Sequence, residues 1–118
     1  MRDYRELKIW EKGMEIVSTT YDVVEKLPSE ERFGLRSQCS RAAVSIPSNI
    51  AEGSARKSVA HFIQYLETSL GSTYELETQT IIIKERFQIG TELTDNLLGL
   101  INEEKKMLGS YIAKLRNN

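Results

Sequence analysis

The chain has 118 residues, of which 40% are hydrophobic and 28% are charged, and its formal net charge is −1. This length suits one domain with a buried core, and the composition excludes disordered, collagen-like and low-complexity chains. We therefore expect a single domain over residues 1–118. No apolar run reaches the length of a membrane span, so we expect no membrane partner.

The spacing of apolar residues predicts helices rather than strands. The chain holds two prolines and no Asn-Gly or Asp-Gly pair, which are the usual hairpin signals. The first helix should run up to Pro28, which stops it. Its apolar stripe follows 3-4 spacing and consists of Leu7, Trp10, Met14, Val17, Tyr21 and Val24.

The second helix should start near Ser29, which precedes two glutamates as an N-cap residue would. Its expected core stripe is Leu35, Cys39, Ala42, Ala43, Ile46, Ile50 and Gly53. Pro47 lies inside this helix and removes one backbone donor, which predicts a kink there. A helix break, with Pro47 in a new first turn, is the alternative.

The third helix should follow Ser58 as its cap, and Gly90 should end it. Its expected core stripe is Phe62, Leu66, Ser69, Thr73, Leu76, Thr80, Ile83 and Phe87. The run of isoleucines at 81–83 points in three directions, so Ile82 is a candidate interface residue that one bundle core cannot cover.

Thr91 is the expected cap of the fourth helix, whose stripe is Leu93, Leu97, Leu100, Ile101, Leu108, Tyr111, Ile112 and Leu115. Short connections make neighbouring helices antiparallel. The sequence therefore predicts an all-α fold, an antiparallel up-down-up-down four-helix bundle with a kinked second helix.

Residues that could support catalysis are few. Cys39 is the single cysteine and lies in an apolar stripe, which favours an inert buried thiol and a cytoplasmic protein. His61 is the single histidine, so neither a di-metal bundle site nor a zinc site has enough ligands. We expect no enzyme activity and no cofactor.

Glu104 stands inside the apolar stripe of the fourth helix, where burying a lone carboxylate is costly. It must be paired, protonated or near the surface, and a structural or interface role is favoured over a catalytic one.

Basic residues concentrate in two zones of the chain. Residues 32–57 carry five bases against one acid, and residues 105–118 carry four bases and no acid. Candidate nucleic-acid contacts are therefore Arg36, Arg41, Arg56, Lys57, Lys105, Lys106, Lys114 and Arg116. The alternative is that these are ordinary solvated or bundle-pairing charges, because no aromatic residues are interleaved with them for stacking.

The stretch SIPSNIAEG over residues 45–53, preceded by Gln38 and by RAAV over residues 41–44, resembles the signature of the 23S rRNA intervening-sequence protein family. Further matching positions cover nearly the whole chain: Leu7, Trp10, Phe33, Gly34, Leu35, Gly71, Ser72, Glu75 and Glu77. Within the signature, Pro47, Asn49 and Glu52 are candidate structural or interface residues, and recognition by Asn49 and Glu52 is the alternative.

The resemblance implies a four-helix bundle of the type called an S23 ribosomal protein in older naming. The family is also similar to the accessory variability protein of diversity-generating retroelements, a basic pentamer that associates with a reverse transcriptase and nucleic acid. This similarity implies a homopentamer here. Two functions follow: a non-catalytic oligomeric scaffold that binds a protein partner, or an accessory protein that binds RNA or DNA.

Overall fold

The computed structural model describes residues 3–118, and four α-helices account for most of them. They are α1 (Lys8–Glu25), α2 (Leu35–Ser54), α3 (Val59–Arg86) and α4 (Thr91–Arg116). Two short 3-10 helices, η1 (Tyr4–Glu6) and η2 (Ser29–Glu31), precede α1 and α2. No strand occurs in this part of the chain, so the predicted all-α fold with four helices is confirmed.

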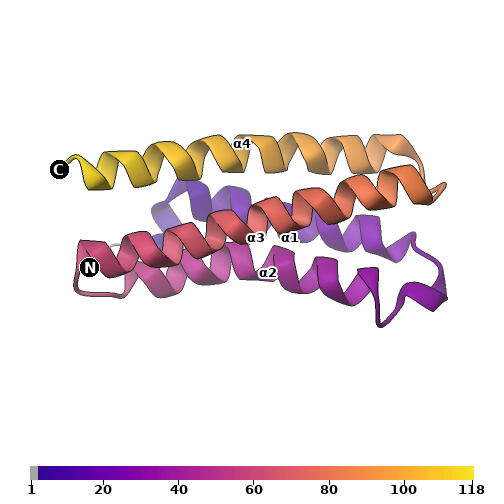
Figure 1. The fold of residues 1–118 in the computed structure, drawn as a ribbon, viewed down its shortest axis with the longest axis horizontal. Helices are drawn as coiled ribbons and strands as arrows, with labels where there is room; N and C mark the ends of the chain where they lie inside the picture. Colours follow the sequence, from indigo (N-terminus) through magenta and orange to yellow (C-terminus); the bar gives the residue numbers. More distant parts are fainter. Residues whose placement is uncertain (1–2) are drawn as a thin grey trace.

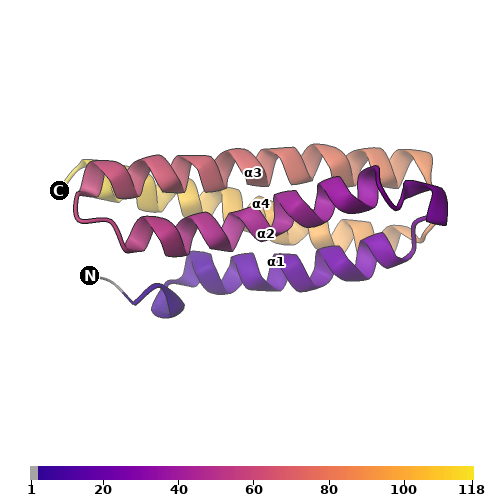
Figure 2. The same ribbon diagram turned by 90° about the horizontal axis from the view of Figure 1, so that it is seen from below.

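The helices pack as a square in cross-section. Both α1 and α3 contact α2 and α4, whereas neither diagonal pair is in contact within residues 3–118. Consecutive helices run in opposite directions along a body of 46 × 23 × 20 Å (Figures 1 and 2). We name the sides of this square by the helices that border them, so the α1–α2 side and the α3–α4 side are opposite each other.

Local backbone chemistry decides where the last two helices begin. As predicted, Ser58 caps α3, because its hydroxyl oxygen accepts a hydrogen bond from the amide of His61 at 3.1 Å. The prediction that Thr91 caps α4 is wrong, since Thr91 is the first helical residue. The preceding Gly90 occupies the cap position with φ of 95°, a conformation that favours glycine.

The start of α2 also differs from the prediction. Ser29 is not its cap but the first residue of η2, and α2 begins only at Leu35. The side chain of Glu31 reaches across this gap, and its carboxylate accepts a hydrogen bond from the amide of Leu35 at 3.2 Å. A carboxylate beside a helix N-terminus is favourable, so Glu31 supplies the capping hydrogen bond that was expected from Ser29.

Pro47 lies inside α2, which continues through it as one helix, so the alternative of a break there is wrong. The bend expected at this position stays a prediction. Polar side chains flank the proline: the Asn49 amide donates to the Ser45 carbonyl at 2.8 Å, and the Ser69 hydroxyl donates to the Ile46 carbonyl at 2.9 Å.

The core stripes predicted for α2, α3 and α4 face the bundle interior, with Leu35, Phe87, Leu93 and Tyr111 at its margin. The stripe predicted for α1 is right for Val24, which is buried, and for Leu7, Trp10 and Val17, which pack at the margin of the core. It is wrong for Met14 and Tyr21, which are 45% and 47% exposed. The buried residues of α1 are Ile9, Gly13, Ile16, Thr19, Thr20, Val23 and Val24. Gly13 explains why this face of α1 is buried. A Cβ at this position would lie 3.3 Å from Pro47 Cβ, so the absence of a side chain on Gly13 lets α1 approach α2 closely.

Candidate functional site

Residues with catalytic chemistry are not gathered in the described part of the chain. His61 is exposed in the first turn of α3, and burial raises the pKa of the Cys39 thiol to about 12. Residues 3–118 hold no cluster of three or more histidine, cysteine, aspartate or glutamate side chains suited to a metal ion. None of the helices described here is long and apolar enough to cross a bilayer. The surfaces of the bundle are therefore the candidate sites.

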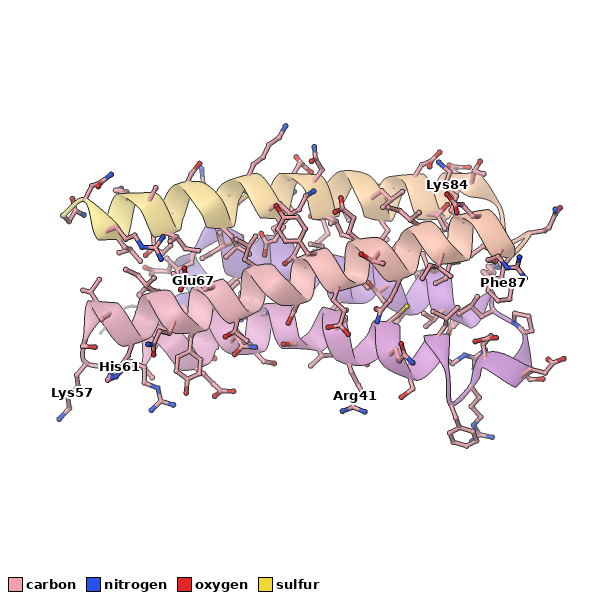
Figure 3. All side chains as sticks on the ribbon, viewed as in Figure 1. Arg41, Lys57, His61, Glu67, Lys84 and Phe87 are labelled. Atoms are coloured by element: carbon pink, nitrogen blue, oxygen red, sulfur yellow. The ribbon has the colours of Figure 1, made fainter. Side chains whose placement is uncertain are left out.

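The signature residues border a groove on the α1–α2 side. This α1–α2 groove has a volume of about 490 Å³ and is lined by Tyr21, Ser40, Arg41, Val44, Ser45, Ser48, Asn49 and Glu52. Arg41 and Glu52 are both exposed, and neither forms an ion pair within residues 3–118. Figure 3 shows the Arg41 side chain extending away from α2 into solvent.

A smaller groove of about 280 Å³ lies on the other flank of α2, against α3. Here the hydroxyls of Ser45 and Ser72 share a hydrogen bond of 2.8 Å, and Arg41 and Glu75 both line the groove. Arg41 thus borders both grooves. The polar half of the signature points outward, while Ile46, Pro47 and Ile50 of the same stretch are buried.

Large apolar side chains are exposed on two opposite sides of the bundle. Tyr21 and Val44 border the α1–α2 groove, and Met14 lies two turns before Tyr21 on the same face of α1, so these three form the surface on the α1–α2 side. On α3 the exposed apolar side chains include Tyr74 and Ile81, and Lys105 of α4 lies 4.9 Å from the Tyr74 ring centroid, which places this second surface on the α3–α4 side. Of the isoleucines at 81–83, Ile83 is buried whereas Ile82 is 40% exposed.

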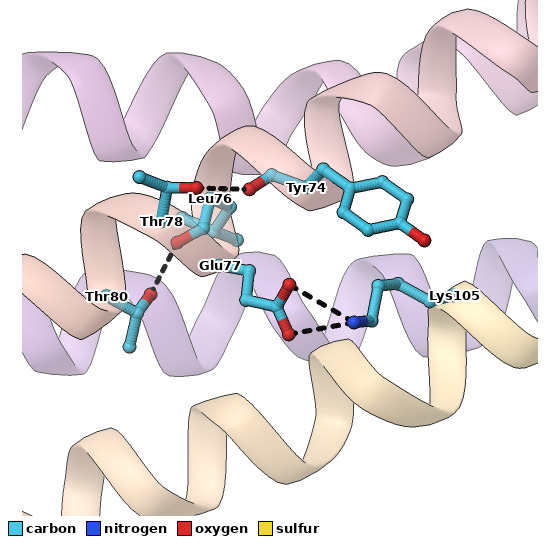
Figure 4. Close-up of polar contacts among 6 residues, drawn as sticks. All are labelled: Tyr74, Leu76, Glu77, Thr78, Thr80 and Lys105. Carbon is cyan, nitrogen blue, oxygen red and sulfur yellow. Dashed lines mark hydrogen bonds and ion pairs between the residues drawn. The ribbon is translucent and has the colours of Figure 1, made fainter.

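Four of the eight candidate nucleic-acid contacts form hydrogen bonds within the subunit: Lys105, Arg116, Arg36 and Arg56. Lys105 donates to both carboxylate oxygens of Glu77, at 2.9 and 3.1 Å (Figure 4). Arg116 forms an ion pair with Glu67, and the Arg36 guanidinium donates to the Leu27 carbonyl at 3.2 Å, which ties α2 to the preceding turn. These contacts fit the alternative that such bases pair within the bundle.

Arg56 is exposed, as are the four remaining candidates, Arg41, Lys57, Lys106 and Lys114. Arg56 donates to the Tyr65 hydroxyl at 2.9 Å, and its guanidinium lies 4.9 Å from the centre of that ring. Lys57 follows it in the α2–α3 connection, near the end of the bundle that holds the C-terminus (Figure 3). Sequence reasoning missed such aromatic neighbours, because Tyr65 comes from the next helix.

Lys106 and Lys114 line a groove on the α1–α4 side, together with a third lysine that charge counting passed over. This α1–α4 groove has a volume of about 380 Å³ and is formed by Leu7, Lys8, Ile9, Lys106, Met107, Ser110, Tyr111 and Lys114. Lys8 belongs to the acid-rich first zone of the chain, so a count by zone hides it. In the folded protein Lys8 lies next to the C-terminal half of α4, which carries Lys106 and Lys114.

Glu104 is fully buried, and neither of its carboxylate oxygens has a hydrogen-bond partner within residues 3–118. Of the three expected states, a paired or surface position is therefore wrong for this subunit. Burial raises the pKa of Glu104 to about 8, although the charge of Lys12 acts in the opposite direction. A Cβ on Gly13 would lie 3.4 Å from its Oε2, so the carboxyl occupies space that the glycine leaves open.

Comparisons with known proteins identify the family and a structural relative of this bundle. The family model described as 23S rRNA-intervening sequence protein matches residues 5–110. A crystal structure from Bacteroides thetaiotaomicron, of a protein with unknown function from the S23 ribosomal protein family, is similar, with a TM-score of 0.80 and 26% sequence identity. The similarity covers 88% of this chain and 97% of that chain. No curated protein matches the chain.

Proposed function

The chain belongs to the 23S rRNA-intervening sequence protein family, and we propose that it is a non-catalytic, cytoplasmic protein that assembles into a homopentameric ring and serves as a scaffold for a partner. The observation that carries this proposal is the pair of exposed apolar surfaces on opposite sides of the bundle. A family model and a structural relative without an assigned activity are in keeping with it.

The two surfaces differ in composition and come from different helices. One consists of Met14, Tyr21 and Val44 on the α1–α2 side, and the other contains Tyr74 and Ile81 on the α3–α4 side. Apolar side chains of this size, exposed together, are typical of surfaces that a partner covers.

Two different surfaces on opposite sides favour a head-to-tail assembly. A twofold dimer would use one self-complementary patch and leave the other exposed, whereas a head-to-tail contact uses both and closes into a ring when the rotation allows. The number of five subunits follows from the resemblance to pentameric accessory proteins.

The signature residues support the α1–α2 side as one half of this contact. Arg41 and Glu52 lie on one face of α2, about three turns apart, so they are too distant to pair with each other. Both are exposed beside Tyr21 and Val44, where charged groups of a neighbouring subunit could neutralise them. Pairing across a subunit contact would fix its register.

Two surface variants test the head-to-tail arrangement by multi-angle light scattering. Met14→Lys/Tyr21→Lys removes the apolar surface on the α1–α2 side, and Tyr74→Lys/Ile81→Lys removes the one on the α3–α4 side. We expect the wild type to form a ring at micromolar concentration and each variant alone to be a monomer. Mixed together, the variants should form a one-to-one dimer, because each retains the surface that the other has lost.

Three outcomes would overturn the proposal: a monomeric wild type, a variant that forms dimers alone, or variants that both keep the mass of the wild type. The exposed substitution Gln64→Lys on α3 serves as the matched control for added charge. It should leave the wild-type mass unchanged.

Nucleic-acid binding is a second candidate, because Arg56 lies beside the Tyr65 ring and Lys57 is exposed next to it. A planar cation beside an aromatic ring is a suitable platform for an unpaired base. In this case the protein would be an accessory to an enzyme such as a reverse transcriptase. Gel retardation of structured RNA and duplex DNA should then weaken with salt and with Arg56→Ala. No retardation at low salt would exclude this candidate.

A further inference from the structure

The α1–α4 groove differs from the two apolar surfaces in having an apolar floor between basic side chains. Leu7 and Ile9 of the α1 start and Met107 and Tyr111 of α4 form the floor. Tyr111 is held in place from below, since its ring packs edge-on against Phe62 at a centroid distance of 6.0 Å. The Tyr111 ring of this floor is therefore backed by Phe62, which is fully buried in the core.

The three lysines of this groove have no acidic partner. Lys8, Lys106 and Lys114 form no ion pair within residues 3–118, whereas Lys12 and Lys105 on the same two helices both do. Three cations that flank one apolar floor are complementary to a ligand with an apolar face and negative edges.

The spacing along α4 narrows the class of ligand further. Lys106 and Lys114 are eight residues apart on one helix, a separation of about 12 Å, with Met107 and Tyr111 between them. A partner α-helix that lies along the groove can match this separation, if it carries acidic residues about two turns apart and an apolar stripe between them.

We propose that the α1–α4 groove docks an acidic amphipathic helix of a partner protein. The apolar stripe of that helix covers Leu7, Ile9, Met107 and Tyr111, and its carboxylates pair with the lysines at the groove edges. A nucleic-acid backbone would use the lysines but leave the apolar floor without a partner. A helix uses both features.

The position of the groove is compatible with the proposed ring but does not depend on it. Ring contacts through the α1–α2 and α3–α4 sides leave the intervening α1–α4 side uncovered. Each subunit of a ring would then present one groove, and several copies would raise the avidity for a multivalent partner.

Fluorescence anisotropy with a designed probe tests this proposal. The probe is a fluorescein-labelled peptide of about four helical turns, with leucines at 3-4 spacing and glutamates on both flanks of the stripe. A peptide of the same composition in scrambled order is its control. The protein variant is Lys106→Glu/Lys114→Glu, and Lys26→Glu/Arg32→Glu, which changes exposed bases outside the groove by the same charge, is the matched control.

We expect the amphipathic peptide to bind the wild type and the control variant on the order of tenfold more tightly than the scrambled peptide. Lys106→Glu/Lys114→Glu should lose at least about tenfold in affinity and should gain affinity for a probe with lysine in place of glutamate. This exchange of preference requires a folded groove, so an unfolded variant cannot imitate it.

Equal binding of the ordered and scrambled peptides would overturn the proposal, as would an equal loss in the control variant. So would a labelled oligonucleotide that loses affinity for Lys106→Glu/Lys114→Glu when the peptide does not. A drop in the light-scattering mass of that variant would assign the groove to a second copy of this chain instead. Whether the wild type forms the proposed ring is measured separately, from its light-scattering mass.

Discussion

Replacement of Glu104 by glutamine should stabilise the protein, and the gain should grow with pH. The carboxyl is fully buried without a hydrogen-bond partner, and burial raises its pKa from 4.5 to about 8. Glutamine has nearly the same shape but cannot ionise. The comparison therefore isolates the cost of keeping an ionisable group at this place in the core.

The direction and size of the effect follow from proton linkage. The folded state binds the Glu104 proton more tightly than the unfolded chain does, so raising the pH above 4.5 favours unfolding until the pH reaches about 8. One pKa unit corresponds to about 1.4 kcal/mol, which gives a cost of about 3 kcal/mol at neutral pH and about 1 kcal/mol near pH 5. Above pH 8 the cost levels off.

Urea unfolding of both proteins between about pH 5 and about pH 8, at one fixed protein concentration, measures this difference. The free energy of unfolding of Glu104→Gln relative to wild type should rise by roughly 2 to 4 kcal/mol across this range. Glu85→Gln, on the exposed surface of α3, should show almost no such rise. A difference between Glu104→Gln and wild type that stays constant with pH would refute the reasoning.

Three further predictions concern the same fold. Gly53→Ala should lower the free energy of unfolding by about 1 to 3 kcal/mol in thermal or urea melts, because the new Cβ would lie 2.6 Å from Tyr65 Cβ; unchanged stability would contradict the close contact of α2 and α3. Gly109→Ala, on the exposed face of α4 with no atom within 4 Å of an added Cβ, should raise stability by about 0.5 to 1 kcal/mol, and a loss would show that this face is covered. The Cys39 thiol, whose pKa burial raises to about 12, should resist a thiol reagent at about pH 8 until urea unfolds the chain; rapid labelling of the folded protein would contradict its burial.

The helices were predictable from the sequence because apolar residues recur at helical spacing in all four. The wrong placement of Met14 and Tyr21 on α1 has a definite physical cause. The buried face of α1 includes Gly13, Thr19 and Thr20, which do not count toward an apolar stripe, whereas Met14 and Tyr21 do. Close packing against Pro47 requires a small residue, so steric fit overrides hydrophobicity there. Met14 and Tyr21, which therefore lie on the surface, form part of one of the proposed subunit contacts.

The candidate site was less predictable, since its contacts join residues that are distant in the chain. Charge zones identified Lys105 and Arg116 as candidates, but their partners Glu77 and Glu67 come from α3. In the same way, Lys8 joins the basic half of α4 only because α1 and α4 are neighbours. The sequence shows which residues carry charge, and the packing determines which charges stay without a partner.

The square arrangement of the helices has a consequence for the entropy of the unfolded chain. Three of the four contacts between α-helices in the described residues join helices that are consecutive in the chain, and the α1–α4 contact alone joins the first α-helix to the last. Closing that contact confines the longest loop, so it carries the largest loss of chain entropy. An engineered disulfide between α1 and α4 would therefore constrain the unfolded chain more than one within any pair of consecutive helices.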